Sequence, residues 1–205
     1  IIDINNLKFD NNTQIIEVNN EVYSKISFRN STEGIIGLVE IKQNSNTNLN
    51  SKKINLALVL DGLEKPGNIG AILRSCDASA VDIVILTNEK CDIHNPNVIR
   101  SSIGTFFSNN VISMSNEEAL EFLKNNNFKI YGTSLNATQN YNSIQYNSST
   151  ALIAGSENNG ISDFWIKNSD ILIKIPMLGM ADSLNVSVSS AICLSEVNRQ
   201  NKFNR

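Results

Sequence analysis

Short, mostly apolar runs alternate along most of the chain with stretches in which apolar positions recur at helical spacing. Unbroken apolar runs of this length are typical of strands that are buried on both faces of a sheet. Such strands are expected at LALVL (56–60), DIVIL (82–86), FKIYGTS (128–134), ALIAG (151–155) and ILIKI (171–175). Helices are expected over 68–78, 95–103, 117–124 and 186–199. The alternation predicts an α/β fold with a parallel sheet covered by helices on both faces.

The first 53 residues follow a different pattern. QIIEV (14–18) and IIGLVEI (35–41) are strand-like, and a short helix is expected between them over 21–26. About 40 residues is marginal for an independent core. The uniformly polar run that follows is typical of a linker. We therefore expect three parts: an N-terminal segment (1–43), a linker (44–53) and a main domain (54–205).

Three glycine-containing bends follow predicted strands. The first, in LVLDGLEKPGNIGAILRSC (58–76), carries Asn68 and Arg74; the second, in IAGSENNG (153–160), carries Glu157. The third bend contains Ser183 and Asn185, where Asn185 or Ser187 would also serve as a helix N-cap. Ligands of parallel sheets bind beyond the carboxyl ends of the strands, so these bends mark the expected site.

Two phosphate-binding motifs can be tested against the first bend. Gly62 and Gly67 have the G-x-x-x-x-G spacing of a P-loop, but Asn68 stands where its lysine is needed. The G-x-G-x-x-G motif of dinucleotide-binding proteins is absent from this bend. Nucleotide hydrolysis and NAD binding are therefore disfavoured.

Composition narrows the class of protein further. With 41% hydrophobic residues the chain can build a core, and a net charge of −3 argues against a generic basic nucleic-acid coat. Cys76, Cys91 and Cys193 form no C-x-x-C pair, so we expect reduced thiols and no metal site. His94, the single histidine, is expected to be structural or solvated rather than a general base. Without a membrane-length apolar run or a signal peptide, we expect a soluble, cytoplasmic protein.

Taken together, the three bends resemble the motifs of the SpoU/TrmH family of SPOUT methyltransferases. The motifs are NIGAILR (68–74), AGSENNG (154–160) and IPMLGMADSLNVSV (175–188), within residues 55–200. NPNVIRSSIGTFF (95–107) is similar to the segment that the family has between the first two motifs. Residues 25–41 resemble the end of the family's RNA-substrate-binding domain, of which 1–43 would be a remnant.

The resemblance implies a fold and an activity. The fold is a SPOUT methyltransferase domain (54–205) with a deep C-terminal trefoil knot, in a homodimer. The cofactor is S-adenosyl-methionine, bound in the knot. The reaction is methyl transfer to a ribose 2′-hydroxyl of ribosomal or transfer RNA.

The resemblance also implies which residues bind the cofactor. They are Thr133, Ser134, Leu135, Gly155, Ile175, Met177 and Leu184. An adenine ring needs an apolar slot with backbone hydrogen bonds. Ile175, Met177 and Leu184 are expected to form its walls, and Gly155 to let the backbone approach the ligand. By residue type alone, Ile175 and Leu184 would be ordinary core residues.

The residues expected to act on the acceptor are Arg74, Asn68, Glu157, Ser183 and Asn185. The family assigns activation of the hydroxyl to the arginine that Arg74 matches. Because the pKa of arginine lies above 12, we expect Arg74 to contact the ribose and phosphate and stabilise oxyanion character. It would accept a proton only within the assembled complex. Asn68 would position the ribose or order the first bend, and Glu157 would orient Arg74 or its loop neighbours. Ser183 and Asn185 would line the acceptor side.

Further contacts and other functions remain open at this point. Arg100 and Ser102 are candidates for contact with RNA phosphate. The chain could be a non-catalytic RNA-binding relative, or a SPOUT enzyme that methylates a base nitrogen. The retained polar residues favour an enzyme, and SLNVSV (183–188) favours ribose.

Overall fold

The structure is a computed structural model that describes residues 8–9, 12–28, 34–41 and 54–201. The chain divides into two compact units, residues 1–43 and 44–205. The predicted linker, 44–53, lies outside the described residues.

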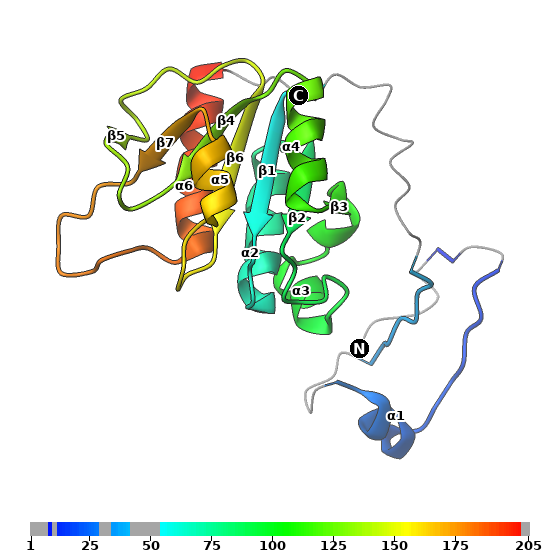
Figure 1. Cartoon of the computed structure of the whole chain (residues 1–205). Helices are drawn as coiled ribbons and strands as arrows, with labels where there is room; N and C mark the ends of the chain where they lie inside the picture. The colour runs from blue at the N-terminus through cyan, green and yellow to red at the C-terminus, as the bar shows by residue number, and fades with distance from the viewer. Residues whose placement is uncertain (1–7, 10–11, 29–33, 42–53, 202–205) are drawn as a thin grey trace. The chain divides into compact units, whose positions relative to one another are not determined.

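The second unit is built on a sheet of seven strands in the order β3-β2-β1-β6-β4-β7-β5 (Figure 1). The strands are β1 (Leu56–Asp61), β2 (Ile83–Thr87), β3 (Val111–Ser113), β4 (Lys129–Thr133), β5 (Gln139–Asn140), β6 (Thr150–Gly155) and β7 (Ile171–Lys174). Every neighbouring pair is parallel. The predicted α/β class and parallel sheet are confirmed.

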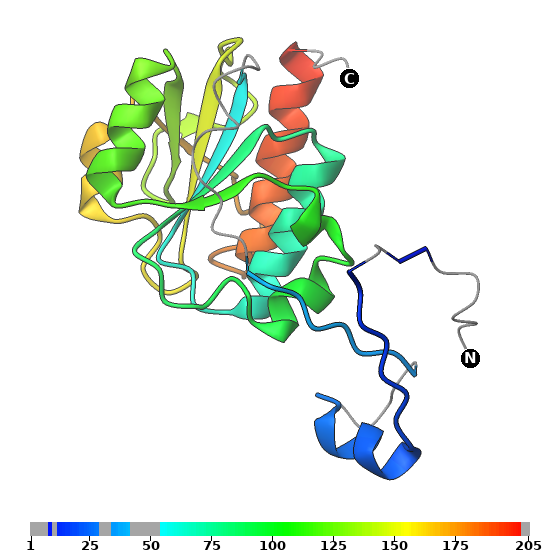
Figure 2. The same ribbon diagram turned by 90° about the vertical axis from the view of Figure 1, so that its right-hand side faces the viewer.

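Helices cover both faces of this sheet. They are α2 (Pro66–Ala78), α3 (Pro96–Ser101), the 3₁₀ helix η3 (Thr105–Phe107), α4 (Asn116–Asn125), α5 (Asp163–Asn168) and α6 (Val186–Asn201). In Figures 1 and 2, α2 and α6 lie on one face while α4 and α5 lie on the other. Alternate residues of β1 enter the two cores: Leu58 packs in the cluster with α2 and α6, and Val59 in the cluster with α4 and α5. Burial on both faces explains the unbroken apolar runs.

All five predicted strands and all four predicted helices of this unit are confirmed, within a few residues at each end. α4 begins one residue before its predicted start, where Ser115 and Glu118 form a reciprocal capping box. The sequence interpretation missed β3, β5, α5 and η3. These elements have three, two, six and three residues, too few for a hydrophobic period to be recognised.

The cysteines are free, as expected. Cys76 and Cys193 are buried in the core, where desolvation raises the pKa of both thiols, that of Cys193 to about 12. They are therefore protonated at neutral pH and pack as small apolar side chains. None of the helices in the described ranges is long and apolar enough to cross a bilayer.

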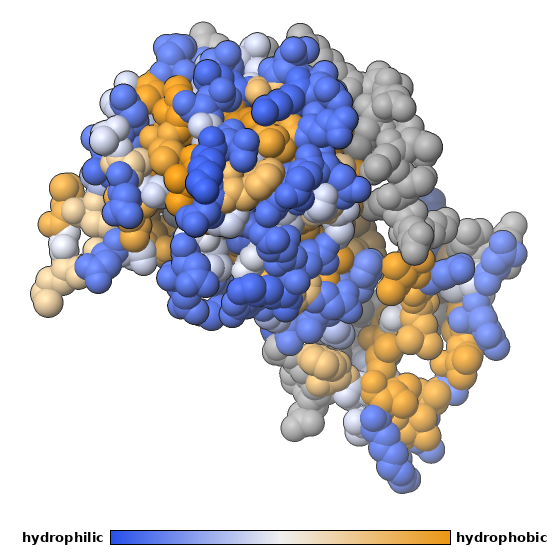
Figure 3. Space-filling view, viewed as in Figure 1, coloured by the Kyte–Doolittle hydropathy of each residue, from blue (hydrophilic) through white to orange (hydrophobic). Residues whose placement is uncertain are grey.

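The first unit contains one helix, α1 (Asn20–Ile26), as predicted. The prediction of strands at 14–18 and 35–41 is wrong, because neither segment pairs with another in the described residues. Ile16, Leu38 and Val39 are largely exposed, and Figure 3 shows apolar surface over much of this unit. Strand propensity without a pairing partner and a surface to pack on does not make a strand.

An ion pair in the last turn of α6 is expected to make the stability of the folded protein depend on pH. Glu196 accepts two hydrogen bonds of 2.8 Å from the Arg199 guanidinium, which lower the pKa of Glu196 to about 2, from an ordinary 4.5. Because folding lowers the pKa of Glu196, its carboxylate stabilises the folded protein above pH 4.5. This stabilisation disappears as the pH falls toward 2.

We therefore expect Glu196→Gln to be less stable than the parent protein at neutral pH. The difference in unfolding free energy should shrink between pH 4.5 and about 2. Urea unfolding at several pH values measures this difference. Glu121→Gln, on the exposed face of α4, is the matched control. A difference that stayed constant over this range would contradict the assignment.

Candidate functional site

The three predicted bends meet at Asn68. β1 and β6 are neighbours that end level, with Asp61 opposite Gly155, so their following loops begin side by side. Asn68, in the first turn of α2, donates through Nδ2 to Glu157 Oε1 in the second bend. Its Oδ1 accepts a hydrogen bond of 3.2 Å from Asn185 Nδ2 in the third bend. One amide therefore links three segments that are far apart in the sequence.

Asn185 has two roles at once. Its Oδ1 accepts from the Ser187 backbone N–H at 2.9 Å and from the Ser187 hydroxyl at 2.7 Å, which caps the start of α6. Its Nδ2 is then directed to Asn68. The capping role and the site role considered from the sequence are therefore compatible.

Glu157 contacts neighbours in the first bend and not Arg74. Its carboxylate accepts from Asn68 and lies 3.9 Å from Lys65 Nζ, whereas no contact with Arg74 is found in the described residues. Of the two predicted roles, only orientation of loop neighbours fits this geometry. The sequence interpretation missed Lys65. Its position in the first bend, directly before Pro66, was the only available signal.

Arg74 lies on the exposed side of α2. Its guanidinium takes part in none of the hydrogen bonds or ion pairs found among the described residues. It lines a groove of about 720 Å³ between α2 and α6. A purely structural surface arginine would be paired with an acidic side chain. Among the described residues, Arg74 has no such partner. The guanidinium is available to an anionic ligand.

A second pocket, of about 290 Å³, lies at the carboxyl ends of β4, β6 and β7. All seven residues predicted to bind a cofactor line it, namely Thr133, Ser134, Leu135, Gly155, Ile175, Met177 and Leu184. Glu157 and Ser183 line it as well. The pocket therefore combines apolar walls with hydroxyl and amide groups, one carboxylate and one lysine, Lys174.

Gly155 has a structural reason that the sequence did not reveal. A Cβ at this position would lie 2.0–2.1 Å from backbone atoms of Gly160 and Ile161. The missing side chain therefore allows the second bend to fold back against its own start, where Ser156 and Gly160 form a β-bridge. Gly155 therefore shapes the pocket by permitting this turn, and the close approach of its backbone to a ligand stays a prediction.

Asp61 is a buried carboxylate that sequence reasoning did not select. It is 3% exposed and holds Ser162, which follows the second bend and precedes α5, to the ends of β1 and β2. Oδ1 accepts from Asn88 Nδ2 at 2.6 Å and from the Thr87 hydroxyl at 3.3 Å, while Oδ2 accepts from the Ser162 backbone N–H at 2.6 Å. Both oxygens are therefore occupied by donors.

Asp61→Asn is expected to lower the free energy of unfolding by about 1–3 kcal/mol, since its new amide must face one of those donors. Urea unfolding measures the change. Asp170→Asn is the matched control, because Asp170 is partly exposed and its amide oxygen would keep the 2.8 Å bond from the Ile130 backbone N–H. Equal losses in both variants would contradict the role given to Asp61.

Two other sequence candidates are resolved by burial. Ser102 is fully buried, and its hydroxyl donates to the Ile99 carbonyl at 2.7 Å, so it is not available to RNA phosphate. Arg100 remains exposed on α3.

His94 lines neither pocket; its Nδ1 is 3.4 Å from Asp92, and its ring packs edge-on against Phe106. Among the described residues, no group of three or more His, Cys, Asp and Glu side chains could hold a metal ion.

Comparison with known proteins gives a consistent result. The model of the SpoU rRNA methylase family matches residues 55–195. A Staphylococcus epidermidis protein named as a TrmH family tRNA/rRNA methyltransferase is 37% identical over 149 residues. That match covers 72% of this chain and 60% of the relative, so the chain spans about 60% of the length of such relatives. A Borreliella burgdorferi protein, named an uncharacterized tRNA/rRNA methyltransferase, is 32% identical over 97% of this chain and 92% of its own length.

Solved structures are similar as well. The crystal structure of an RNA 2′-O ribose methyltransferase superimposes with a TM-score of 0.75 at 34% identity, over 91% of this chain and 72% of the other. An rRNA methyltransferase from Sinorhizobium meliloti with bound AdoMet gives a TM-score of 0.82 at 25% identity, over 88% and 70% of the two chains.

Proposed function

Because the chain belongs to the SpoU rRNA methylase family, we propose that it transfers a methyl group from S-adenosyl-methionine to a ribose 2′-hydroxyl of ribosomal or transfer RNA. One observation carries the proposal. A hydrogen-bonded chain from Glu157 through Asn68 to Asn185 joins the 290 Å³ pocket to the start of α6. That helix forms one wall of the groove that contains Arg74. A cofactor site and an acceptor site are thus connected by fixed side chains.

The smaller pocket fits the cofactor chemically. Its volume of about 290 Å³ is close to the lower limit for small-molecule sites. Leu135, Ile175, Met177 and Leu184 offer apolar surface to an adenine ring, and Glu157 offers negative charge to a sulfonium. The relative from Sinorhizobium meliloti was solved with AdoMet bound, which supports the same cofactor here. The bound cofactor would supply an electrophilic methyl group.

The chain's own residues then have separate tasks. Arg74 would hold the ribose and phosphate of the acceptor and stabilise negative charge that develops on its oxygen. It would receive a proton only in the assembled complex, since its pKa lies far above neutrality. Asn68, Ser183 and Asn185 would order the boundary between the two sites, so that donor and acceptor meet in line.

Finer features of the family are part of the proposal. The strand order, in which β7 lies beside β4 and not beside the preceding β6, is compatible with a deep C-terminal trefoil knot. A homodimer rests on the resemblance alone. We assign residues 54–205 to the catalytic domain, 44–53 to a linker and 1–43 to a remnant of an RNA-substrate-binding domain. The protein would act in the cytoplasm, where its RNA is found.

Nucleoside analysis tests the proposal. Ribosomal and transfer RNA from cells with and without the gene would be digested and compared by mass spectrometry, and the missing modification restored in vitro with purified protein. We expect the loss of a single 2′-O-methylnucleoside. Loss of a base-methylated nucleoside would favour the alternative SPOUT chemistry. Unchanged RNA, together with no binding of S-adenosyl-methionine in calorimetry, would favour a non-catalytic RNA-binding relative.

A further inference from the structure

The pocket at the carboxyl ends of β4, β6 and β7 contains two charges of opposite sign. Of the described residues that line it, only Glu157 and Lys174 are charged. Glu157 follows β6, and Lys174 is the last residue of β7. Because β4 lies between these two strands, their backbones are about 10 Å apart. The two charges therefore come from strands on opposite sides of β4.

The Lys174 ammonium has no acidic partner among the described residues. It takes part in none of the ion pairs or side-chain hydrogen bonds found there. Glu157, by contrast, accepts from Asn68 and lies 3.9 Å from Lys65 Nζ. Lys174 is also half-buried. An anionic group of a ligand would supply the counter-ion that this half-buried cation lacks.

Alternation along β7 places Lys174 on the side of the sheet that α5 covers. Leu172 packs in the cluster with residues of α4 and α5, and Ile173 in the cluster with residues of α2 and α6. Side chains two residues apart in a strand share a face, so Lys174 is on the face of Leu172. Ile166 of α5 lines the same pocket. The lysine therefore belongs to the α5 side of the pocket wall.

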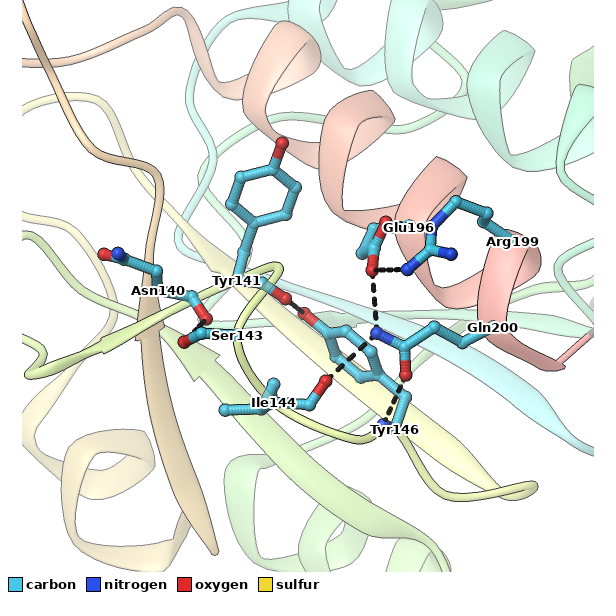
Figure 4. A network of polar contacts seen from close by, with 8 residues as sticks. All are labelled: Asn140, Tyr141, Ser143, Ile144, Tyr146, Glu196, Arg199 and Gln200. Carbon is cyan, nitrogen blue, oxygen red and sulfur yellow. Dashed lines mark hydrogen bonds and ion pairs between the residues drawn. The ribbon is translucent and has the colours of Figure 1, made fainter.

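The backbone of Lys174 is fixed by the loop that follows β5. Its carbonyl accepts from the Tyr141 N–H at 2.9 Å, which continues the pairing of β5 with β7. The Tyr141 carbonyl accepts from the Tyr146 hydroxyl at 2.8 Å. Gln200 of α6 holds the same loop, since its amide donates to the Ile144 carbonyl and accepts from the Tyr146 N–H, at 3.0 Å each (Figure 4). The end of β7 is therefore ordered before a ligand binds, which lowers the entropic cost of binding.

The cofactor carries charges that match both ends of this arrangement. S-adenosyl-methionine has a cationic sulfonium, and its amino-acid end has a carboxylate beside an ammonium group. Glu157 offers negative charge to the sulfonium. The carboxylate then needs donors of its own. Asn136 and Asn158 also line the pocket and can donate, but only Lys174 offsets the negative charge.

We propose that Lys174 binds the amino-acid carboxylate of S-adenosyl-methionine. This inference rests on the proposed function, because it takes this pocket to be the cofactor site. Contacts of opposite charge at two strand ends would fix the direction in which the cofactor lies, with its sulfonium on the side of Glu157. Lys174 would thus contribute both affinity and orientation.

Calorimetric titration of the full chain tests the inference, with S-adenosyl-methionine and its decarboxylated analogue as probes. The analogue keeps the adenine, the sulfonium and the ammonium group, and lacks the carboxylate. Lys174→Met should weaken binding of S-adenosyl-methionine by about tenfold, the size expected for one hydrogen bond between charged groups at a half-buried site. Binding of the analogue should not weaken. Lys174→Arg should stay near the parent protein, and Lys174→Glu should bind the analogue more tightly than S-adenosyl-methionine.

Lys167→Met is the matched control, because it removes the same charge from an exposed position of α5 outside the pocket lining. Thermal unfolding verifies that each variant folds. Equal losses for the two probes in Lys174→Met, or no loss for either, would overturn the inference. A loss limited to RNA affinity would also overturn it and assign Lys174 to the nucleic acid. If the parent protein binds S-adenosyl-methionine but methylates no RNA, the proposed function fails, and the two probes still decide the role of Lys174.

Discussion

Arg74→Ala is expected to lower the rate of methyl transfer by about 100- to 1000-fold, and to leave the affinity for S-adenosyl-methionine nearly unchanged. The rate effect is the size expected for the loss of one group that stabilises developing charge. The affinity is expected to persist because Arg74 lines the groove between α2 and α6, and not the pocket of the seven cofactor residues. Single-turnover transfer from labelled cofactor measures the rate, and calorimetry measures the affinity.

Arg74→Lys separates charge from geometry in the same assay. Lysine keeps a positive charge but loses the planar fork that can contact two oxygens at once. We expect activity between those of Arg74→Ala and the parent protein. Normal turnover in Arg74→Ala would remove this residue from the mechanism. A parallel fall in cofactor affinity would mean that the groove and the pocket are not separate sites.

The central strands could be predicted because burial on both faces leaves a continuous apolar signal, as in LALVL and ALIAG. The segments at 14–18 and 35–41 have similar composition, yet they are not strands. Their composition says which residues would suit a strand, but not whether another segment is available for pairing. For β5 the reverse holds, because its two residues are defined only by their pairing with β7.

The residues of the site also divide into those that the sequence could predict and those that depend on tertiary contacts. The seven pocket residues could be predicted because each ends or follows a strand whose carboxyl end lies at the same edge of the sheet. The partners of Glu157 could not, since a choice between Arg74 and Lys65 depends on the direction in which α2 leaves the first bend. Asp61 likewise has no local signal. Its role comes from its contact with the Ser162 backbone N–H, which is far away in the sequence.

Asn68→Ala is expected to reduce methyl transfer by about 10- to 100-fold, because it breaks two contacts with one change. A double-mutant cycle with Asn185→Ala should then be strongly non-additive. Once Asn68 is absent, the Nδ2 group of Asn185 has already lost this partner, so the second substitution adds little. We expect a coupling of about 0.5–3 kcal/mol between the two residues. Additive effects would mean that the 3.2 Å contact between the two amides has no part in the site.

Glu157→Gln completes this test by separating hydrogen bonding from charge. The glutamine carbonyl can still accept from Asn68 Nδ2, so the junction between the bends should be kept. The negative charge on the pocket wall is lost, and so is the attraction to Lys65, 3.9 Å away. If Glu157 favours the sulfonium, affinity for S-adenosyl-methionine should fall more than affinity for its neutral product, S-adenosyl-homocysteine. Equal losses for the two molecules would indicate that Glu157 acts only by holding Asn68 in place.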